Sequence, residues 1–322
     1  MAQIDIFNGD ADGICALTQL RNAAPAQASL ITGVKRDIAL VAKAEITAGD
    51  HVTVLDISFD KNREGVLNAL DAGANVFYVD HHFAGEIPSN DRLTTIIDPD
   101  PNVCTSLLVN GYLKGKFVEW AVTGAFGDNL NAVARAIAAP LGLAEKQLTV
   151  LQELGTYMNY NAYGSSIEDL HFAPAELFEL VRPYPTPFAF VEGARASFEK
   201  LASGYAQDMA RAATVKPIRE TEKTAVFILP NEAWARRVSG VYSNDLANES
   251  PGRAHAVLTE RPGGTYLVSV RAPLEKKQGA DALCRKFPTG GGRGAAAGIN
   301  ALPVDQLDAF IDALAAAYPS RP

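Results

Sequence analysis

Aspartates that follow short apolar segments constrain the fold of this chain more than any other feature. The segments span residues 4–7, 52–55, 76–79 and 122–126, and the acidic residues after them are Asp10, Asp12, Asp56, Asp80 and Asp128. The pair His81-His82 comes directly after Asp80. Such segments are typical of buried parallel strands, whose carboxyl ends meet at one edge of an open α/β sheet, where these folds bind ligands. The sequence therefore predicts that these distant residues converge at that edge.

The chemistry of such a cluster favours a metal centre. Converging carboxylates repel one another and raise one another's pKa unless cations neutralise them. Oxygen ligands mixed with imidazole suit Mn²⁺, Mg²⁺ or a similar divalent ion, and the carboxylates are numerous enough for two ions that share a bridging group. The alternative is that each aspartate caps a helix or forms a turn, which is the better interpretation for any one of them alone. The whole set, with its histidine pair, makes the metal centre the stronger hypothesis.

Size and composition indicate a two-domain globular protein. The chain has 322 residues, 48% of them hydrophobic and 20% charged, which is ordinary for a soluble protein. No apolar stretch reaches the ~18 residues of a membrane span, and the first residues do not resemble a signal peptide. Cys15, Cys104 and Cys284 lack metal-binding spacing, so we interpret them as buried thiols of a reducing compartment. These features predict a cytoplasmic protein without membrane contact.

Charge is distributed unevenly along the chain. The net charge of −8 argues against binding of long duplex nucleic acid. Residues 1–150 contain 11 Lys and Arg against 18 Asp and Glu, whereas residues 251–300 contain 8 against 3. An acidic half that holds metal and a locally basic half suit a small phosphorylated substrate, although scatter of surface charge is the alternative.

The order of strand and helix patterns predicts two α/β domains. Strand and helix patterns alternate in the first half, as in βαβ units with a mostly parallel sheet, and Thr105 is expected to cap one of the helices. A long amphipathic pattern at 188–213 leads to a domain boundary at 190–220. The second half has strand patterns at 224–229, 254–259 and 265–272, helical patterns at 233–248 and 304–318, and a glycine-rich turn at 290–294. An irregular aromatic segment, 159–164, either stacks on a base or packs against helices.

Asp80-His81-His82 completes a set of motifs that resembles a known family. With Asn8-Gly-Asp10-Ala-Asp12-Gly, Asp56 and Asp128, it resembles the DHH phosphoesterase superfamily in order and spacing. The segments Val-Ser-Val-Arg271 and Thr-Gly290-Gly291-Gly292-Arg293-Gly resemble the DHHA1 domain of the same proteins. The resemblance covers nearly the whole chain. It implies a mostly parallel open sheet flanked by helices in residues 1–190, a linker helix in 191–220 and a smaller α/β DHHA1 domain in 221–322.

The resemblance also implies roles for individual residues. It implies two Mn²⁺ ions, for which Mg²⁺ or Co²⁺ could substitute. Asp10 would bind the first ion. Asp12, His81 and Asp128 would bind the second ion, and Asp56 would bridge both. Two ions ~3.5–4 Å apart neutralise phosphate oxygens during in-line displacement. His82 would contact the phosphate or the leaving oxygen, and Asp80 would orient a neighbouring imidazole.

The first metal site departs from the family pattern. Many members have a histidine four residues before the first aspartate of the Asp-x-Asp motif, where this chain has Ile6. RecJ-like members have an aspartate two residues before it, where this chain has Asn8. Asn8 offers an amide oxygen but no charge, so the resemblance predicts a weaker first site.

The glycine motif has a physical interpretation of its own. Three consecutive glycines, Gly290, Gly291 and Gly292, let backbone N–H groups approach an anion without interference from Cβ atoms. Arg293 stands where the family usually has histidine, and its forked donors suit a terminal phosphate or a base edge. Arg271 would reach the same pocket. The alternative is a flexible turn and a solvated strand end.

These features together predict a metal-dependent phosphodiesterase. It would cleave short RNA or linear dinucleotides of the pGpG or pApA type to nucleoside monophosphates, and a cleft between its domains would limit substrate length. One alternative is a RecJ-like single-strand exonuclease, against which the acidic charge and the short chain argue. Another is a non-catalytic nucleotide-binding regulator that has lost its first metal. Base preference, cleavage polarity and homodimer formation are left open by the sequence.

Overall fold

The computed structural model describes residues 1–319. The chain divides into two compact units, the first covering Met1–Ser203 and the second beginning at Gly204. The division falls inside helix α9 (Arg195–Ala212), within the segment that the sequence assigns to a linker helix. Among the described residues, no helix is both long enough and apolar enough to span a membrane.

A five-stranded parallel sheet forms the centre of the first unit, with the strand order β2-β1-β3-β4-β5. Its strands are β1 (Gln3–Phe7), β2 (Ser29–Ile31), β3 (His51–Leu55), β4 (Asn75–Asp80) and β5 (Leu93–Ile97). Phe7 pairs with Leu55, and Leu55 pairs with Val79. These three strands therefore end side by side, and the residues that follow them share one edge of the sheet.

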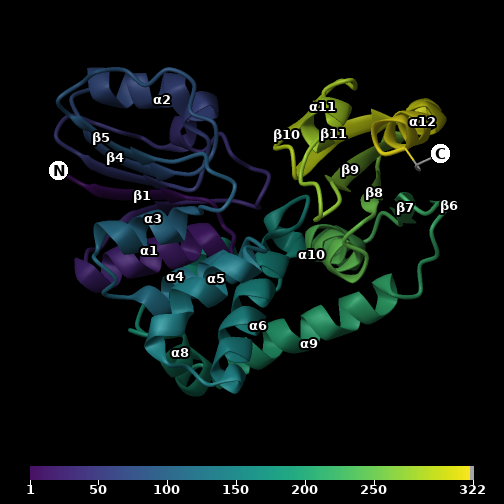
Figure 1. The fold of residues 1–322 in the computed structure, drawn as a ribbon. Helices are drawn as coiled ribbons and strands as arrows, with labels where there is room; N and C mark the ends of the chain where they lie inside the picture. The colour runs from purple at the N-terminus through teal and green to yellow at the C-terminus, as the bar shows by residue number, and fades with distance from the viewer. Residues whose placement is uncertain (320–322) are drawn as a thin grey trace. The chain divides into compact units, whose positions relative to one another are not determined.

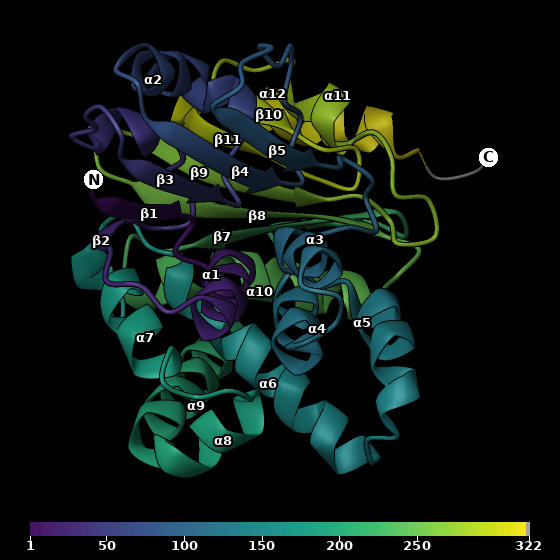
Figure 2. The same ribbon diagram turned by 90° about the vertical axis from the view of Figure 1, so that its left-hand side faces the viewer.

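Helices cover both faces of this sheet, as Figures 1 and 2 show. Helix α2 (Phe59–Asp71) lies on one face, and α1 (Ala11–Ala23), α3 (Thr105–Tyr112) and α4 (Val118–Gly127) lie on the other. The remaining helices of the unit are α5 (Asn131–Ala138), α6 (Glu145–Ala162), α7 (Pro174–Val181) and α8 (Pro187–Gly193). Separate hydrophobic clusters fill the two sides of the sheet, one around Phe7 and Trp120 and the other around Ile6 and Tyr78.

The second unit is built on a six-stranded mixed sheet with the order β10-β11-β9-β8-β7-β6. Its strands are β6 (Arg219–Glu220), β7 (Thr224–Leu229), β8 (Ala254–Arg261), β9 (Thr265–Arg271), β10 (Gly290–Gly292) and β11 (Ala296–Pro303). Within the described part of this unit, β7 and β8 pair in parallel and the other neighbouring strands are antiparallel. Helix α10 (Ala233–Glu249) lies on one face, and α11 (Ala280–Cys284) and α12 (Leu307–Ala317) lie on the other (Figure 1). The predicted α/β fold class is confirmed.

The predicted strand at 122–126 is wrong, because this segment lies inside α4. All residues from Trp120 to Gly127 are buried, since α4 packs between α1 and α6. A helix buried on every side gives the same unbroken apolar run as a parallel strand, so periodicity cannot separate the two. Gly124 and Gly127 allow the close packing, because a Cβ on either would overlap side chains of α3 or α1.

Two further segments differ from the prediction. The aromatic segment at 159–164 is mostly the end of α6, and Tyr160 is fully buried, with its hydroxyl 2.8 Å from Nε2 of His171. The packing alternative therefore holds for Tyr160, which is not available to stack on a base. The amphipathic pattern at 188–213 forms two helices, α8 and α9, that are separated at Ala194.

The glycine-rich turn begins later than predicted. Gly290–Gly292 is strand β10, which pairs with β11, and the turn follows at Arg293, whose N–H donates to the carbonyl of Ala296 (2.8 Å). A Cβ on Gly290 would overlap the carbonyl oxygen of Cys284, whereas one on Gly291 would meet open space. At least one of these glycines is therefore required for packing against α11. The three cysteines are buried, as predicted, and none of them forms a disulfide bond within the described residues.

Candidate metal centre

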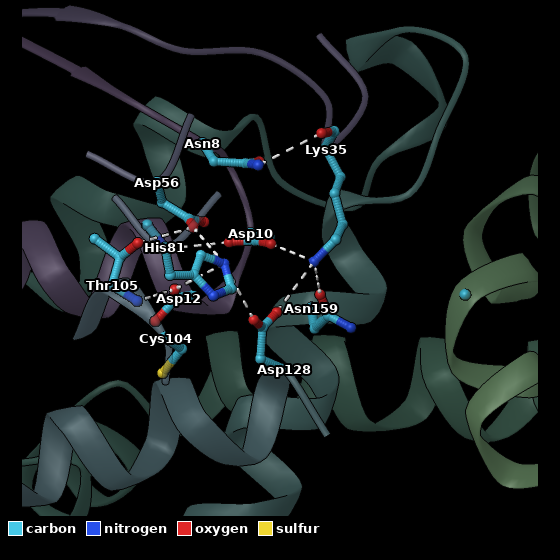
Figure 3. A network of polar contacts seen from close by, with 12 residues as sticks. Asn8, Asp10, Asp12, Lys35, Asp56, His81, Cys104, Thr105, Asp128 and Asn159 are labelled. Atoms are coloured by element: carbon cyan, nitrogen blue, oxygen red, sulfur yellow. Dashed lines mark hydrogen bonds and ion pairs between the residues drawn. The ribbon is translucent and has the colours of Figure 1, made fainter. Parts of the chain in front are cut away.

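His81 lies in the middle of a cluster of aspartates at the carboxyl edge of the first sheet (Figure 3). Its Nε2 atom is 3.3 Å from Oδ1 of Asp56, 3.6 Å from Oδ2 of Asp128 and 4.0 Å from Oδ2 of Asp12. The ligand atoms of Asp12, His81 and Asp128 all lie within 4.8 Å of one another, and so do those of Asp56, His81 and His82. The cluster is buried, since the side chain of Asp128, at 10% exposure, is the most open of the three carboxylates.

The tautomer of His81 is fixed by a hydrogen bond on the far side of its ring. Nδ1 lies 2.8 Å from the carbonyl oxygen of Val103, which can only accept. Nδ1 therefore carries a proton, and Nε2 is the ring nitrogen that faces the carboxylates. A backbone carbonyl that orients a histidine in this way is the usual arrangement behind a metal-binding imidazole.

The backbone at Asp56 is unusual and determines where its carboxylate lies. Asp56 directly follows β3 and has a φ of +60°, a region that aspartate tolerates better than most residues. Its N–H donates to the carbonyl of Val79 (3.0 Å), and its Oδ1 accepts a hydrogen bond from the hydroxyl of Thr105 (3.0 Å). Asp56 is thus held from both sides at the centre of the cluster.

Asp10 and Asp12 are positioned by helix starts. Asp10 is the N-cap of α1, and its Oδ1 accepts from the N–H of Gly13 (3.1 Å). The two oxygens of Asp12 accept from the N–H groups of Thr105 and Ser106, both at 2.7 Å, at the start of α3. The predicted cap of α3 by the Thr105 side chain is wrong, because Asp12 accepts from these donors and the Thr105 hydroxyl donates to Asp56 instead.

Asp128 reaches the same cluster from a helix rather than from a strand. It is the residue that ends α4, and its N–H donates to the carbonyl of Gly124 (3.0 Å). The convergence of Asp128 with the other carboxylates therefore holds although the strand predicted before it does not exist.

His82 and Asp80 form a second pair beside the cluster. Nδ1 of His82 lies 2.7 Å from Oδ1 of Asp80, and the His82 side chain is 35% exposed whereas Asp80 is fully buried. The other oxygen of Asp80 is buried without a hydrogen-bond partner among residues 1–319. The Asp80 carboxylate therefore holds His82 through Nδ1, and Nε2 is the ring nitrogen that can face a ligand.

Lys35 was not predicted as part of the site. Its ammonium forms an ion pair with Oδ2 of Asp10, lies 2.9 Å from Oδ1 of Asn159 and lies 3.5 Å from Oδ1 of Asp128 (Figure 3). It also lies 5.5 Å from the ring centroid of Tyr163. The signal available in the sequence was its position four residues after β2, a strand of the same sheet.

The electrostatics of the cluster show a need for positive charge. The pKa of Asp56 is raised well above its usual value, first by burial and then by the charges of Asp10, Asp12 and Asp128. Burial opposes the charge on Lys35, but Asp10, Tyr163 and Asp128 outweigh it and raise the pKa of Lys35 well above its usual value. Lys35 is therefore charged, and the remaining carboxylates still repel one another.

The residues around His81 fit a divalent metal ion. They supply one imidazole nitrogen and three carboxylates, a mixture that suits Mn²⁺ and similar ions. Adjacent ligand atoms of a six-coordinate ion with bonds of ~2.1 Å lie ~3 Å apart, close to the separations of 3.3 and 3.6 Å observed here. A bound ion would also relieve the repulsion that raises the pKa of Asp56.

The residues that differ from the family pattern supply no charge to the cluster. Ile6 is fully buried in the hydrophobic cluster beside α2. Asn8 is 5% exposed, and its amide nitrogen lies 3.5 Å from the carbonyl oxygen of Lys35. Its Oδ1 is buried without a partner among the described residues. The neutral Asn8 therefore contributes no charge to the cluster.

In the second unit, the structure places Arg271 against α10. Its Nε donates to Oδ1 of Asn244 (2.7 Å), and its Nη2 lies 3.5 Å from the carbonyl of Gly240. Arg271 also pairs across the sheet with Ala296, close to the turn that carries Arg293. The strand end at Arg271 is thus half-buried and oriented. Gly290 and Gly291 are also half-buried, whereas Gly292 and Arg293 are exposed.

No protein-family model matches this chain, and no curated protein matches it. Solved structures do match its fold. The exonuclease RecJ bound to manganese matches with a TM-score of 0.60 and 16% identity over 99% of this chain and 91% of that one. The pGpG-specific phosphodiesterase PggH from Vibrio cholerae matches with a TM-score of 0.54 and 13% identity over 98% of this chain and 97% of that one.

The chain has the same fold as these two proteins. RecJ from Thermus thermophilus in complex with Mn²⁺ has the same fold, with a TM-score of 0.65 and 18% identity over 98% of this chain but only 51% of that protein. The similarity that the DHH and glycine motifs predict is thus confirmed at the level of the fold. Two of the matching proteins were solved with manganese.

Proposed function

We propose that this chain is a divalent-metal-dependent phosphodiesterase that hydrolyses short oligoribonucleotides or linear dinucleotides to nucleoside monophosphates. The observation that carries this proposal is the buried ring of Asp12, Asp56 and Asp128 around Nε2 of His81, with the exposed edge of His82 beside it. The fold shared with RecJ and with a pGpG-specific phosphodiesterase supports the reaction class.

The proposed chemistry divides between the ion and the side chains. Asp12, Asp56, His81 and Asp128 would hold a divalent ion at this centre, Mn²⁺ by preference, which would supply positive charge to the phosphate oxygens and make a water molecule more acidic. His82 donates a proton from Nε2 to the leaving oxygen, and the buried Asp80 stabilises the charged imidazole while its hydrogen bond fixes the ring.

The second unit is proposed to bind the part of the substrate away from the scissile bond. Arg271, the glycines of β10 and Arg293 supply cationic forks and exposed backbone, which suit a terminal phosphate or a base. A site that grips one end of a small substrate favours dinucleotides over long strands. The excess of basic residues in residues 251–300, 8 against 3, is consistent with an anionic ligand there.

A single-strand exonuclease is the second candidate function. The similarity to two RecJ structures favours it. A channel enzyme grips many phosphates, however, and its affinity falls steeply with salt, which suits a basic protein better than one with a net charge of −8.

A length series of substrates tests the proposal directly. The protein with Mn²⁺ is incubated with RNA and DNA from dinucleotides to strands of about twenty nucleotides, and the rate is followed against length. We expect dinucleotides to be hydrolysed fastest, and no hydrolysis by His81→Ala. A rate that rises with length would favour the exonuclease, and no metal-dependent hydrolysis of any substrate would leave a nucleotide-binding regulator.

A further inference from the structure

Lys35 lies where the family resemblance places the first of two metal ions. Asp10 is the aspartate assigned to that ion, and its Oδ2 is already in an ion pair with the Lys35 ammonium. The same ammonium lies 3.5 Å from Asp128 and 2.9 Å from the amide oxygen of Asn159. Three oxygen donors from separate segments therefore surround one lysine nitrogen in the way that oxygen ligands surround a cation.

The backbone of Lys35 is held in this position by its own contacts. Its N–H donates to the carbonyl of Ala162 at the end of α6 (2.9 Å). The neighbouring Gly33 packs so closely on the loop after β1 that a Cβ on Gly9 would overlap the Gly33 carbonyl oxygen. The Lys35 side chain is only 21% exposed. The fold itself thus directs this lysine into the cluster, and the side chain is not a surface lysine that is merely attracted by nearby acids.

The remaining ligands of a first ion are weak in this chain. Ile6 belongs to the hydrophobic core and Asn8 is neutral, so neither supplies the imidazole or carboxylate that the resemblance would require. Only Asp10 and the shared Asp56 would remain as anionic ligands, and Asp10 is already paired with Lys35.

The sum of charges in the cluster also favours one divalent ion over two. The cluster contains four carboxylates, Asp10, Asp12, Asp56 and Asp128, and the ammonium of Lys35. One divalent ion plus the ammonium gives three positive charges against four negative ones, whereas two divalent ions plus the ammonium give five against four. A second ion bound to Asp10 would also lie next to a buried like charge, where repulsion is only weakly screened.

We propose that the Lys35 ammonium replaces the first metal ion, so that this chain binds one divalent ion, at Asp12, Asp56, His81 and Asp128. This inference rests on the proposed phosphodiesterase function, in which the ammonium supplies the second positive charge that faces the substrate phosphate. Lys35 supplies a positive charge at the site where Ile6 and Asn8 fail to supply ligands for a metal ion. In this chain a lysine side chain therefore replaces a bound ion.

Metal stoichiometry tests this without reference to activity. Equilibrium dialysis with Mn²⁺ and elemental analysis measure ions per chain, and electron paramagnetic resonance separates an isolated Mn²⁺ from a spin-coupled pair. We expect one isolated ion in the wild type. Lys35→Met keeps the length of the side chain but removes the charge, and should take up a second ion, with a spin-coupled signal that is stronger in Lys35→Met/Asn8→Asp.

Lys43→Met is the matched control, because Lys43 pairs with Asp37 in the same connecting segment and is 52% exposed. It should bind one ion, as the wild type does. A spin-coupled pair in the wild type would overturn the proposal, and so would a single ion in both Lys35 variants. A single ion in a protein that hydrolyses no phosphodiester would leave this inference standing and refute the proposed function, whereas hydrolysis with two ions would do the reverse.

Discussion

Strand β3 has a buried aspartate at each end, and the two differ in every respect that matters for stability. Asp50, before the strand, accepts hydrogen bonds from the N–H groups of Ala2 (2.7 Å) and Thr47 (2.9 Å), and these donors lower its pKa to about 2. Asp56, after the strand, is buried among other carboxylates, and its pKa is raised. One strand thus carries a carboxylate that stabilises the fold and one that destabilises it.

The difference shows that the two edges of this sheet have different roles: the acid at the amino edge stabilises the fold, and the acids at the carboxyl edge form the candidate site. At the amino edge, donors surround the acid and its charge is satisfied within the chain. At the carboxyl edge, the chain supplies an excess of acids that only cations from outside the backbone network can balance. Strongly perturbed carboxylates of this second kind are typical of functional sites.

The largest expected effect is at Asp56. Asp56→Asn keeps a side chain that tolerates positive φ and can still accept from Thr105, but it removes the central charge. Hydrolysis should fall by orders of magnitude and Mn²⁺ binding should be lost, while the metal-free protein becomes no less stable because one repulsion is gone. Equilibrium dialysis measures Mn²⁺ binding, and thermal unfolding in a chelator measures the stability of the metal-free protein. Asp60→Asn, at a half-exposed position at the start of α2, is the control. Wild-type turnover with metal still bound would refute the role of Asp56.

The second prediction extends the comparison to the other unit. If Arg271 binds the far end of a dinucleotide, its contacts help to position the scissile phosphate, and misplacement of substrate costs on the order of 10²-fold in rate. Arg271→Ala should slow hydrolysis of a dinucleotide by about that factor but barely change hydrolysis of bis-p-nitrophenyl phosphate, which is too small to need the second contact.

The control for Arg271 is Arg285→Ala, at an arginine whose side chain is 65% exposed and lies 3.8 Å from the carboxylate of Asp281. It should leave both rates unchanged. An equal loss on both substrates in Arg271→Ala would show that Arg271, with its hydrogen bond to Asn244, serves the fold of the second unit and does not select the substrate.

The same contrast explains what the sequence could predict. Residues at the ends of β1, β3 and β4 were assigned to one edge because parallel strands in register must end together, and this needs only the apolar runs. Asp128 lies at that edge although the strand assigned before it is helix α4, since a fully buried helix has the same apolar run. Lys35 lies in a segment without periodicity, and it is directed inward by the packing of Gly33 on Gly9 and by the hydrogen bond from its own N–H to the carbonyl of Ala162. Contacts between irregular segments leave no repeating pattern in a sequence.

The smallest expected effect is at Asp50, the aspartate of β3 that stabilises the fold. Because its pKa is lowered from the usual 3.8 to about 2, the folded state holds the charged form more tightly than the unfolded state does. Its contribution to the free energy of unfolding is therefore complete above about pH 4 and lost as the pH falls towards 2. Asp50→Asn should be less stable than the wild type at neutral pH in urea unfolding with a chelator present, and the two proteins should converge in acid. Asp91→Asn, at an exposed position, should show no such convergence. A stability difference at Asp50 that does not change with pH would mean that shape and hydrogen bonding, and not charge, account for it, and the contrast with Asp56 would then fail.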